Sequence, residues 1–130
     1  MKYIPIFILI LTTIQSHGQG GKKEPNIITT YNNDAAYRLF PTENMWTFIK
    51  LNTRNGQMWQ VQYSVGEGSR FTTILSAEQL VPKEKEVNNR FTLYATQNMY
   101  NFILLDQIAG RTWQAQWSMD AKNRGIMPIE

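Results

Sequence analysis

Residues 56–64 read GQMWQVQYS, and residues 110–118 read GRTWQAQWS. The same Trp-Gln-x-Gln order thus occurs twice, 54 positions apart, in a chain of 130 residues. Sliding the sequence along itself by this offset aligns residues 36–74 with residues 90–128 without a gap, and thirteen of the thirty-nine aligned pairs are identical. Self-similarity at a fixed offset is the mark of a duplicated structural unit. We therefore interpret the chain as two copies of one module.

Each copy reads as a series of short strands. In the first copy, residues 37–40, 45–52, 58–64 and 70–76 are rich in aromatic and β-branched residues, which is typical of strands. The segments between them (41–44, 55–56 and 66–68) contain Pro, Asn and Gly, the residues that tight turns need. A helix is hard to place after the first twenty residues, because the one capped turn, at 76–80, runs into Pro82.

These strands predict an all-β fold in which two homologous four-stranded antiparallel meanders form a pseudo-two-fold eight-stranded barrel or sandwich. A single four-stranded sheet cannot bury one of its faces alone, so the two copies are expected to pack together. We expect a single β domain over residues 36–130. It consists of repeat 1 (36–76), a linker (77–89) and repeat 2 (90–130).

The N-terminus has the pattern of a secretory signal peptide. A short positive segment, Met1-Lys2-Tyr3, precedes eleven mainly apolar residues (4–14) and a stretch with small residues (16–18). Cleavage is expected after Gly18, with cleavage after Gly20 as the alternative. Because a membrane-spanning helix needs about 20 apolar residues, this segment predicts export without a membrane span. The protein is therefore expected in the periplasm or outside the cell, with residues 19–35 as a flexible N-terminal segment.

Composition excludes several chemistries. The chain has no Cys, and its one histidine, His17, lies in the predicted signal peptide. The mature protein would thus lack the ligands of zinc and copper sites and the usual nucleophile systems, so we expect no metal and no cofactor. The formal charge of the whole chain is +3 and is not gathered into a basic stripe, which argues against a nucleic-acid partner.

A resemblance to a known family covers both copies, and hence most of the mature chain; the second copy shows its pattern. Residues 91–106 follow the pattern Phe-x-Leu-Tyr-x-Thr-x-Asn-Met-Tyr-x-Phe-Ile-x-Leu-Asp, and residues 110–117 follow Gly-Arg-x-Trp-Gln-x-Gln-Trp. Both segments resemble a family of short exported bacterial proteins of unknown function that carry this module in duplicate. The resemblance implies export and a duplicated β module, and it supplies no catalytic residue.

Alternate residues of a strand point to opposite sides, so each copy can be divided by odd and even positions. The face that we expect in the core carries Met45, Thr47, Ile49, Leu51, Trp59, Val61 and Tyr63 in the first copy and Met99, Asn101, Ile103, Leu105, Trp113, Ala115 and Trp117 in the second. The opposite face carries Phe40, Trp46, Phe48, Gln60 and Gln62 in the first copy and Tyr94, Tyr100, Phe102, Gln114 and Gln116 in the second.

The second of these faces is unusual, because solvent faces of antiparallel sheets are ordinarily charged and rich in Thr. Its ten residues are the candidate binding residues. Three interpretations stay open: the chain covers the face with its own segments, the face binds a ligand by stacking and by hydrogen bonds from amides, or it forms a homodimer interface.

The sequence therefore favours an exported, non-catalytic binding domain that recognises a glycan, a peptide or a protein through this face or through its hairpin loops. The alternative is a structural or assembly subunit. A carboxylate-based hydrolase is less favoured. Glu43, Glu67, Asp106 and Asp120 are its candidate acids, and none has an acidic counterpart in the other copy.

Overall fold

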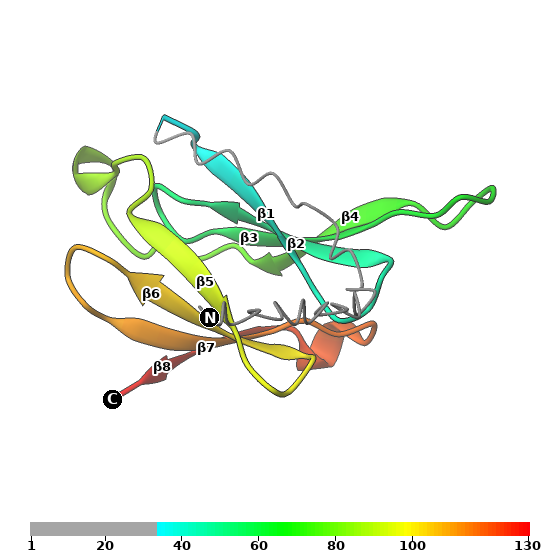
Figure 1. Cartoon of the computed structure of the whole chain (residues 1–130). Helices are drawn as coiled ribbons and strands as arrows, with labels where there is room; N and C mark the ends of the chain where they lie inside the picture. Colours follow the sequence, from blue (N-terminus) through cyan, green and yellow to red (C-terminus); the bar gives the residue numbers. More distant parts are fainter. Residues whose placement is uncertain (1–33) are drawn as a thin grey trace, which may run out of the picture. The chain divides into compact units, whose positions relative to one another are not determined.

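The computed structural model describes residues 34–130, which form two antiparallel sheets of four strands each (Figure 1). The first sheet consists of β1 (Tyr37–Pro41), β2 (Thr47–Asn52), β3 (Met58–Gln62) and β4 (Phe71–Ser76). The second consists of β5 (Phe91–Ala95), β6 (Asn101–Asp106), β7 (Thr112–Gln116) and β8 (Gly125–Ile129). Two short 3-10 helices, η1 (Lys83–Lys85) and η2 (Ala121–Asn123), lie in the connections. The predicted signal peptide and residues 19–33 lie outside the described residues.

In each sheet the strands follow one another in chain order, which confirms the two four-stranded meanders. The strand register is also duplicated. Ile49 pairs with Gln60 in the first sheet and Ile103 pairs with Gln114 in the second. The one irregularity is a shift between Met58 and Trp59 where β3 meets β4.

The β1–β2 turn shows why the repeat preserves Thr and Asn there. The Thr42 hydroxyl donates to the Thr47 carbonyl at 2.8 Å, and the Asn44 side chain accepts from the Trp46 N–H at 2.9 Å. The second sheet repeats both contacts: the Thr96 hydroxyl donates to the Asn101 carbonyl, and the Asn98 side chain accepts from the Tyr100 N–H. Such local bonds specify a turn independently of the rest of the fold.

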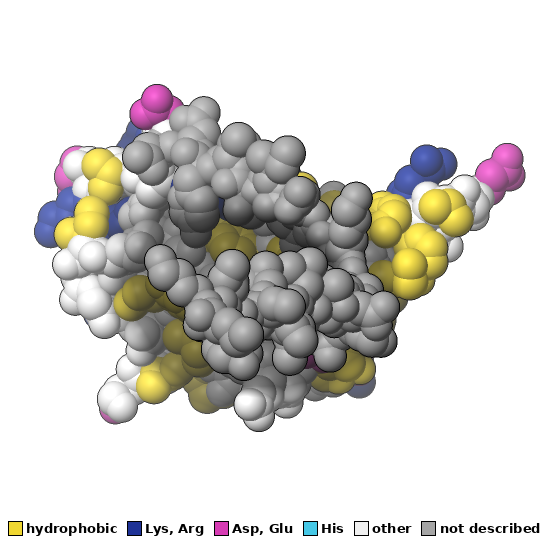
Figure 2. Space-filling model, viewed as in Figure 1, with side chains coloured by type: hydrophobic (Ala, Val, Ile, Leu, Met, Phe, Trp, Pro, Cys, Tyr) yellow, Lys and Arg dark blue, Asp and Glu magenta, His cyan; other side chains and the backbone are white. Residues whose placement is uncertain are grey.

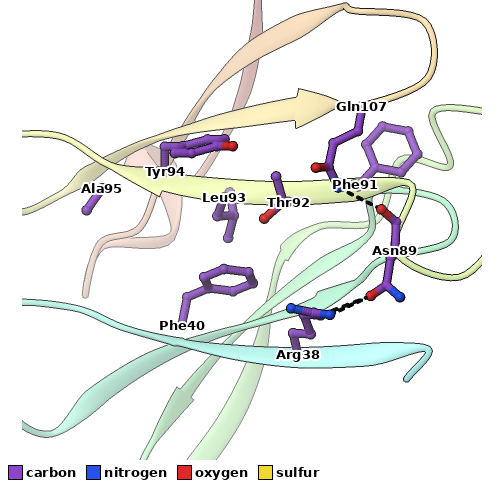
Figure 3. Close-up of a pocket in the computed structure, with 9 residues that line it drawn as sticks. All are labelled: Arg38, Phe40, Asn89, Phe91, Thr92, Leu93, Tyr94, Ala95 and Gln107. Atoms are coloured by element: carbon purple, nitrogen blue, oxygen red, sulfur yellow. Dashed lines mark hydrogen bonds between the residues drawn. The ribbon is translucent and has the colours of Figure 1, made fainter. Parts of the chain in front are cut away.

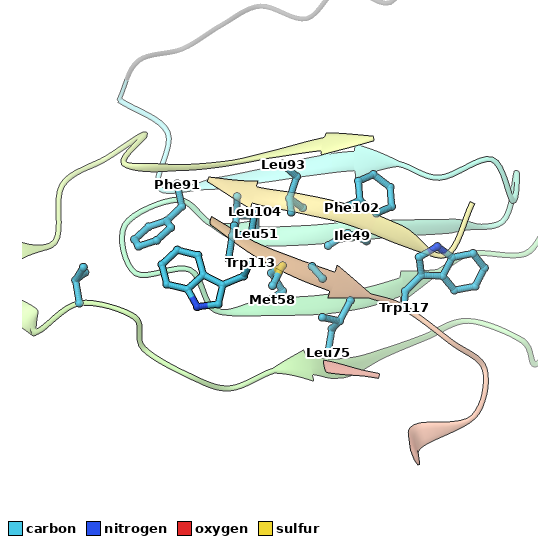
Figure 4. Packing of buried hydrophobic residues seen from close by; sticks show 12 residues of the cluster. Ile49, Leu51, Met58, Leu75, Phe91, Leu93, Phe102, Leu104, Trp113 and Trp117 are labelled. Carbon is cyan, nitrogen blue, oxygen red and sulfur yellow. The ribbon is translucent and has the colours of Figure 1, made fainter. Parts of the chain in front are cut away.

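The core lies between the two sheets, as in a β-sandwich, and no ladder of backbone hydrogen bonds joins them within residues 34–130 (Figure 4). The first sheet contributes Ile49, Leu51, Met58 and Leu75, and the second contributes mainly Phe91, Leu93, Phe102, Leu104, Trp113, Ala115 and Trp117. Inner faces that interdigitate in this way account for most of the stability of a sandwich.

The two sheets bury opposite faces of the same repeat. Ile49 and Leu51 are fully buried, whereas their equivalents Ile103 and Leu105 lie on the outer side of the second sheet. Conversely, Trp113 is buried while its equivalent, Trp59, is partly exposed on the outer side of the first sheet. A two-fold rotation would have buried the same positions in both copies. The second sheet instead lies under the first in the same orientation. The face of the repeat that is buried in one sheet is therefore the outer face in the other.

We name these repeat-related surfaces face A and face B. Face A carries Phe40, Thr47, Ile49, Leu51, Gln60 and Gln62 in the first sheet and Tyr94, Asn101, Ile103, Leu105, Gln114 and Gln116 in the second. Face B carries Tyr37, Leu39, Trp46, Phe48, Lys50, Trp59, Val61 and Tyr63 in the first sheet and Phe91, Leu93, Tyr100, Phe102, Leu104, Trp113, Ala115 and Trp117 in the second. The core is formed by face A of the first sheet against face B of the second.

The odd-even assignment of the faces was therefore wrong in two respects. Leu51 pairs with Met58, an odd position with an even one, so the side-chain order reverses between β2 and β3. The same reversal separates β6 from β7, where Leu105 pairs with Thr112. The length of the connecting turn sets this register, and a slip of one residue moves every side chain to the other face. In addition, the core side changes from face A in the first copy to face B in the second.

As a result, the expected core position is wrong for Trp59, Val61, Tyr63, Asn101, Ile103 and Leu105, which lie on outer faces, and for Met45, which is exposed. It is confirmed for Thr47, Ile49, Leu51, Trp113, Ala115 and Trp117.

The connection between the sheets is tightly anchored rather than purely solvated. Val81 is buried, and the Leu80 N–H donates to the Asn55 carbonyl at 2.8 Å. Thr53 ties the two sheets together, because its carbonyl accepts from the Phe91 N–H at 2.7 Å and its hydroxyl oxygen accepts from the Asn89 N–H at 3.0 Å. These contacts fix the position at which the second sheet begins.

The repeated glycines offer a matched test of this anchoring. Gly56 and Gly110 both have positive φ, +85° and +77°, but a Cβ at Gly56 would lie 2.6 Å from Leu80 Cδ1, whereas nothing surrounds Gly110 within 4 Å. We expect Gly110→Ala to lower the free energy of unfolding by about 1–2 kcal/mol through backbone strain alone. Gly56→Ala should cost about 1–3 kcal/mol more, because Leu80 must move out of its packing. Urea unfolding of both variants measures the difference, and equal losses would contradict it.

Candidate functional site

The ten candidate binding residues do not share one surface. Six of them belong to face A (Phe40, Gln60, Gln62, Tyr94, Gln114 and Gln116) and four to face B (Trp46, Phe48, Tyr100 and Phe102). Gln60 and Phe102 are corrected outright, because their exposed fractions are 0% and 4%. A residue inside the sandwich cannot contact a ligand, so these two are structural.

The glutamines show how equivalent residues take different roles. Gln60 bonds across the sandwich: its side-chain oxygen accepts from the Ser118 N–H at 3.3 Å, and its amide donates to Met119 Sδ at 3.7 Å. Its equivalent, Gln114, is exposed and donates to Asn101 Oδ1 within its own sheet at 2.7 Å. The glutamine amide of face A therefore joins the two sheets in the first copy and is exposed to solvent in the second.

The outer face of the first sheet is rich in aromatic rings. The rings of Trp46 and Tyr63 lie 5.2 Å apart, and those of Tyr37 and Trp59 lie 6.1 Å apart. Lys50 Nζ lies 4.8 Å from the centre of the Trp59 ring, a cation–π contact. Tyr37 and Leu39 are each more than half exposed. This open face B of the first sheet holds Trp46 and Phe48, two of the candidate residues.

The outer face of the second sheet is shallower and more polar. Gln114 and Gln116 line a hollow of about 280 Å³. Met127 and Ile129 of β8 are exposed on the same side as Gln114. This open face A of the second sheet thus combines amides with aliphatic side chains.

A hollow of about 470 Å³ lies between β1 and β5 at the edge of the sandwich (Figure 3). Five consecutive residues of β5, 91–95, line one of its walls. Phe40 of β1 and Leu93 of β5 point toward each other across it, whereas Tyr94 lies on the other side of β5 (Figure 3). Since consecutive residues point to alternate sides, a wall made of all five is the backbone edge of the strand rather than one of its faces.

Hydrogen bonds show which way this edge points. The Arg90 carbonyl accepts from the Gln107 N–H on the β6 side, whereas the Phe91 N–H is directed away from β6 to the Thr53 carbonyl. Because backbone groups alternate along a strand, the N–H and C=O groups of Leu93 and Ala95 also point away from β6 and toward the groove. β5 is an edge strand of its sheet, so these groups have no ladder partner among the strands of residues 34–130.

Polar side chains close one end of this groove. Arg38 Nε and Nη2 donate to the Asn89 side-chain oxygen at 3.1 and 2.7 Å, and the Gln107 amide donates to the Asn89 carbonyl at 2.7 Å (Figure 3). The groove between β1 and β5, referred to below as the edge groove, therefore has an apolar middle and a positively charged end.

The β3–β4 hairpin is a second exposed feature. Figure 2 shows hydrophobic side chains gathered along this hairpin, with charged groups at its tip. Val65 is 88% exposed, and Tyr63 and Phe71 flank it with about two fifths of their surface exposed. Exposed hydrophobic residues in a loop are typical of a contact with another molecule.

The candidate acids lie at separate turns. Glu43 and Glu67 are exposed in the β1–β2 and β3–β4 turns, and the Asp120 side chain accepts from the Lys122 N–H at the start of η2. Asp106 is fully buried at the end of β6, where it accepts two hydrogen bonds of 3.0 Å from Arg90. It also accepts from the Ile108 N–H at 3.0 Å and the Ala109 N–H at 3.1 Å, so it holds the turn that follows β6.

The environment of Asp106 explains its charge state. Burial raises the pKa of this carboxyl, but the hydrogen bonds from Arg90 and from two backbone N–H groups outweigh burial, so its pKa lies below the ordinary value of 3.8. A general acid needs a raised pKa and access to substrate. Asp106 has the opposite properties and acts as a structural anion.

The edge groove contains residues that sequence reasoning missed, among them Arg38, Asn89 and Ala95. Their side chains are of types common in β proteins, and amino-acid composition does not indicate which strand lies at the edge of a sheet. One signal was present: Pro41 ends β1 at the position that aligns with Ala95, and proline in a strand is typical of an edge without a ladder partner.

No family model, curated protein or solved structure matches this chain. Within residues 34–130 there is no group of three or more His, Cys, Asp or Glu side chains that could hold a metal ion. No helix in the described part of the chain is long and apolar enough to cross a membrane.

Proposed function

We propose that this protein is an exported, non-catalytic binding domain that takes an extended peptide along the edge of β5. The observation that carries the proposal is the edge groove, whose wall is five consecutive residues of an edge strand. An extended peptide that pairs with such an edge gains main-chain hydrogen bonds, and neighbouring pockets select its side chains.

The lining of the groove supports a peptide as the ligand. Its volume of about 470 Å³ falls within the range of ligand sites. Phe40, which is partly exposed, offers an apolar contact for one side chain of the peptide, and Arg38 lies at the end of the groove. A peptide with an apolar side chain directed at Phe40 matches this arrangement.

Proline substitution at Ala95 tests the proposal, because it removes one N–H that points into the groove and leaves the pairing with β6 intact. Pro41 occupies the equivalent position in β1, so the fold accepts proline there. For a peptide selected from a phage-displayed library of random linear peptides, we expect Ala95→Pro to weaken binding about tenfold, the loss of one hydrogen bond. Ala95→Ser, which keeps the N–H, should bind as the original protein does.

Isothermal titration of the three proteins with the selected peptide gives the affinities. Equal affinity of Ala95→Pro and Ala95→Ser, or a library that yields no binder, would count against the proposal. A parallel titration with a panel of oligosaccharides distinguishes the ligand class. Oligosaccharide binding that survives Ala95→Pro would move the function to the open aromatic face of the first sheet.

A further inference from the structure

The stacking of the two sheets leaves one face of each sheet outside the core. Face A of the first sheet and face B of the second cover each other in the core. Face B of the first sheet and face A of the second remain on the outside. The two outer surfaces are therefore the same two kinds of surface that already pack together inside the protein.

The open face B preserves the geometry of the buried one. The Tyr37 and Trp59 rings lie 6.1 Å apart at 55°, and the equivalent buried pair, Phe91 and Trp113, lies 6.2 Å apart at 51°. At the other end, the Trp46–Tyr63 distance of 5.2 Å corresponds to 5.0 Å between Tyr100 and Trp117. Within residues 34–130, the surface that receives face A in the core thus has a second version on which no other sheet packs.

The open face A preserves the residues of the buried one at its centre. Ile103 and Leu105 repeat Ile49 and Leu51, both of which have an exposed fraction of 0% in the core. Gln114 repeats Gln60, which bonds across the sandwich to Ser118. The open face A therefore carries the groups that make the internal contact.

We infer that a second copy of this chain docks on the first by the same contact, with the outer face A of one copy on the outer face B of the next. The contact is head-to-tail, because each copy uses two different surfaces. Such heterologous contacts build rings when the rotation between copies closes, and open stacks when it does not. Each added copy would also create a groove between its β1 and the β5 of its neighbour, repeating the edge groove.

One residue weakens this contact relative to the core. The position of Leu104, which is fully buried in the second sheet, is occupied by Lys50 in the first. Lys50 Nζ itself lies 4.8 Å from the centre of the Trp59 ring, so docking of a second copy on this face would take a charged group out of water. The docking of copies is therefore expected to be reversible and dependent on concentration.

Two lysine substitutions separate head-to-tail docking from a symmetric dimer. Val61→Lys places a charge at the centre of the outer face B, because Val61 is the repeat equivalent of the buried Ala115. Ile103→Lys places a charge at the centre of the outer face A. Each variant alone should be a monomer, because every contact needs one face of each kind, and each retains one intact face. An equimolar mixture should form a one-to-one complex through the two intact faces. Neither residue lines the edge groove.

Analytical ultracentrifugation of protein made from the full coding sequence provides the readout, with circular dichroism to check that each variant is folded. Ile74→Lys and Met127→Lys, at exposed positions of the same two faces, replace any variant that fails this check. Lys50→Leu restores the residue of the buried copy and should tighten association about tenfold or more, because a leucine side chain is then buried.

The outcomes are decisive. A mass that rises with concentration, together with a one-to-one complex in the mixture, supports head-to-tail docking. Association that Val61→Lys abolishes and that mixing does not restore would indicate a symmetric contact and overturn the inference. A monomer at every concentration, for the original protein and for Lys50→Leu, would also overturn it. The peptide titration above is independent of these results, since it depends on Ala95.

Discussion

We expect Asp106→Asn to lower the free energy of unfolding by about 3–5 kcal/mol at neutral pH, the usual cost of removing one partner from a buried ion pair. The Asp106 carboxylate receives the Arg90 guanidinium in a two-point contact, and both side chains are buried. Asparagine keeps the shape of the side chain and its acceptor for the turn, so the substitution isolates the loss of charge. Urea unfolding followed by circular dichroism measures the change.

The first repeat provides the control for this experiment. Asn52 stands at the equivalent position, and its side chain accepts from the Arg54 N–H at 3.1 Å, as Asp106 does from Ile108. No buried arginine accompanies Asn52, because Ala36 replaces Arg90 in that repeat. We therefore expect Arg90→Met combined with Asp106→Asn to recover part of the stability lost in Asp106→Asn. A double variant less stable than Asp106→Asn would contradict this explanation.

The same pair predicts a pH dependence. Because the folded state lowers the pKa of Asp106 below 3.8, the stabilisation is complete above that value and is lost as the pH falls through the lower, folded pKa. The difference in stability between the original protein and Asp106→Asn should therefore be constant near neutral pH and shrink in acid. A difference that grows in acid would reverse the assigned direction of the shift.

The second large effect is that alanine substitution at equivalent positions of the two repeats should change the free energy of unfolding by different amounts. Trp113→Ala should lower the free energy of unfolding by about 3–5 kcal/mol and Ile49→Ala by about 2–5 kcal/mol, because both empty the core. Their equivalents, Trp59 and Ile103, lie on outer faces, so alanine substitution of either should lower the free energy of unfolding by only about 1 kcal/mol. Stability therefore depends on the residues of face A in the first sheet and on those of face B in the second.

This pattern tests the stacking of the sheets directly. Two-fold packing would give equal costs to equivalent residues, so similar losses for Trp59→Ala and Trp113→Ala would contradict the arrangement described here. The measurements require dilute protein, since association between copies would add its own stability to the outer faces. Unfolding followed by circular dichroism avoids dependence on the tryptophans that are removed.

Much of the fold could be predicted from local patterns. The duplication marked eight strands, and their bounds agree with the structure within a few residues, because turn residues such as Gly56 and Asn44 act locally. The role of Asp106 was equally local, since an aspartate at the end of a strand can bond to the next backbone N–H groups. The ten candidate residues divide between two faces, because their assignment to one face depended on the register between strands.

The sequence by itself determined the module: two copies of a four-stranded meander, with the same turns and the same register in each. Only the tertiary structure decided which face of each copy is buried. Both faces of the repeat are apolar enough to enter a core, so local preference does not distinguish Trp59 from Trp113 or Ile49 from Ile103. Their positions depend on contacts between sheets, where the anchored connection through Thr53 and Leu80 sets one copy on top of the other. The edge groove arises from that stacking, because it brings β1 and β5 together at one edge of the sandwich.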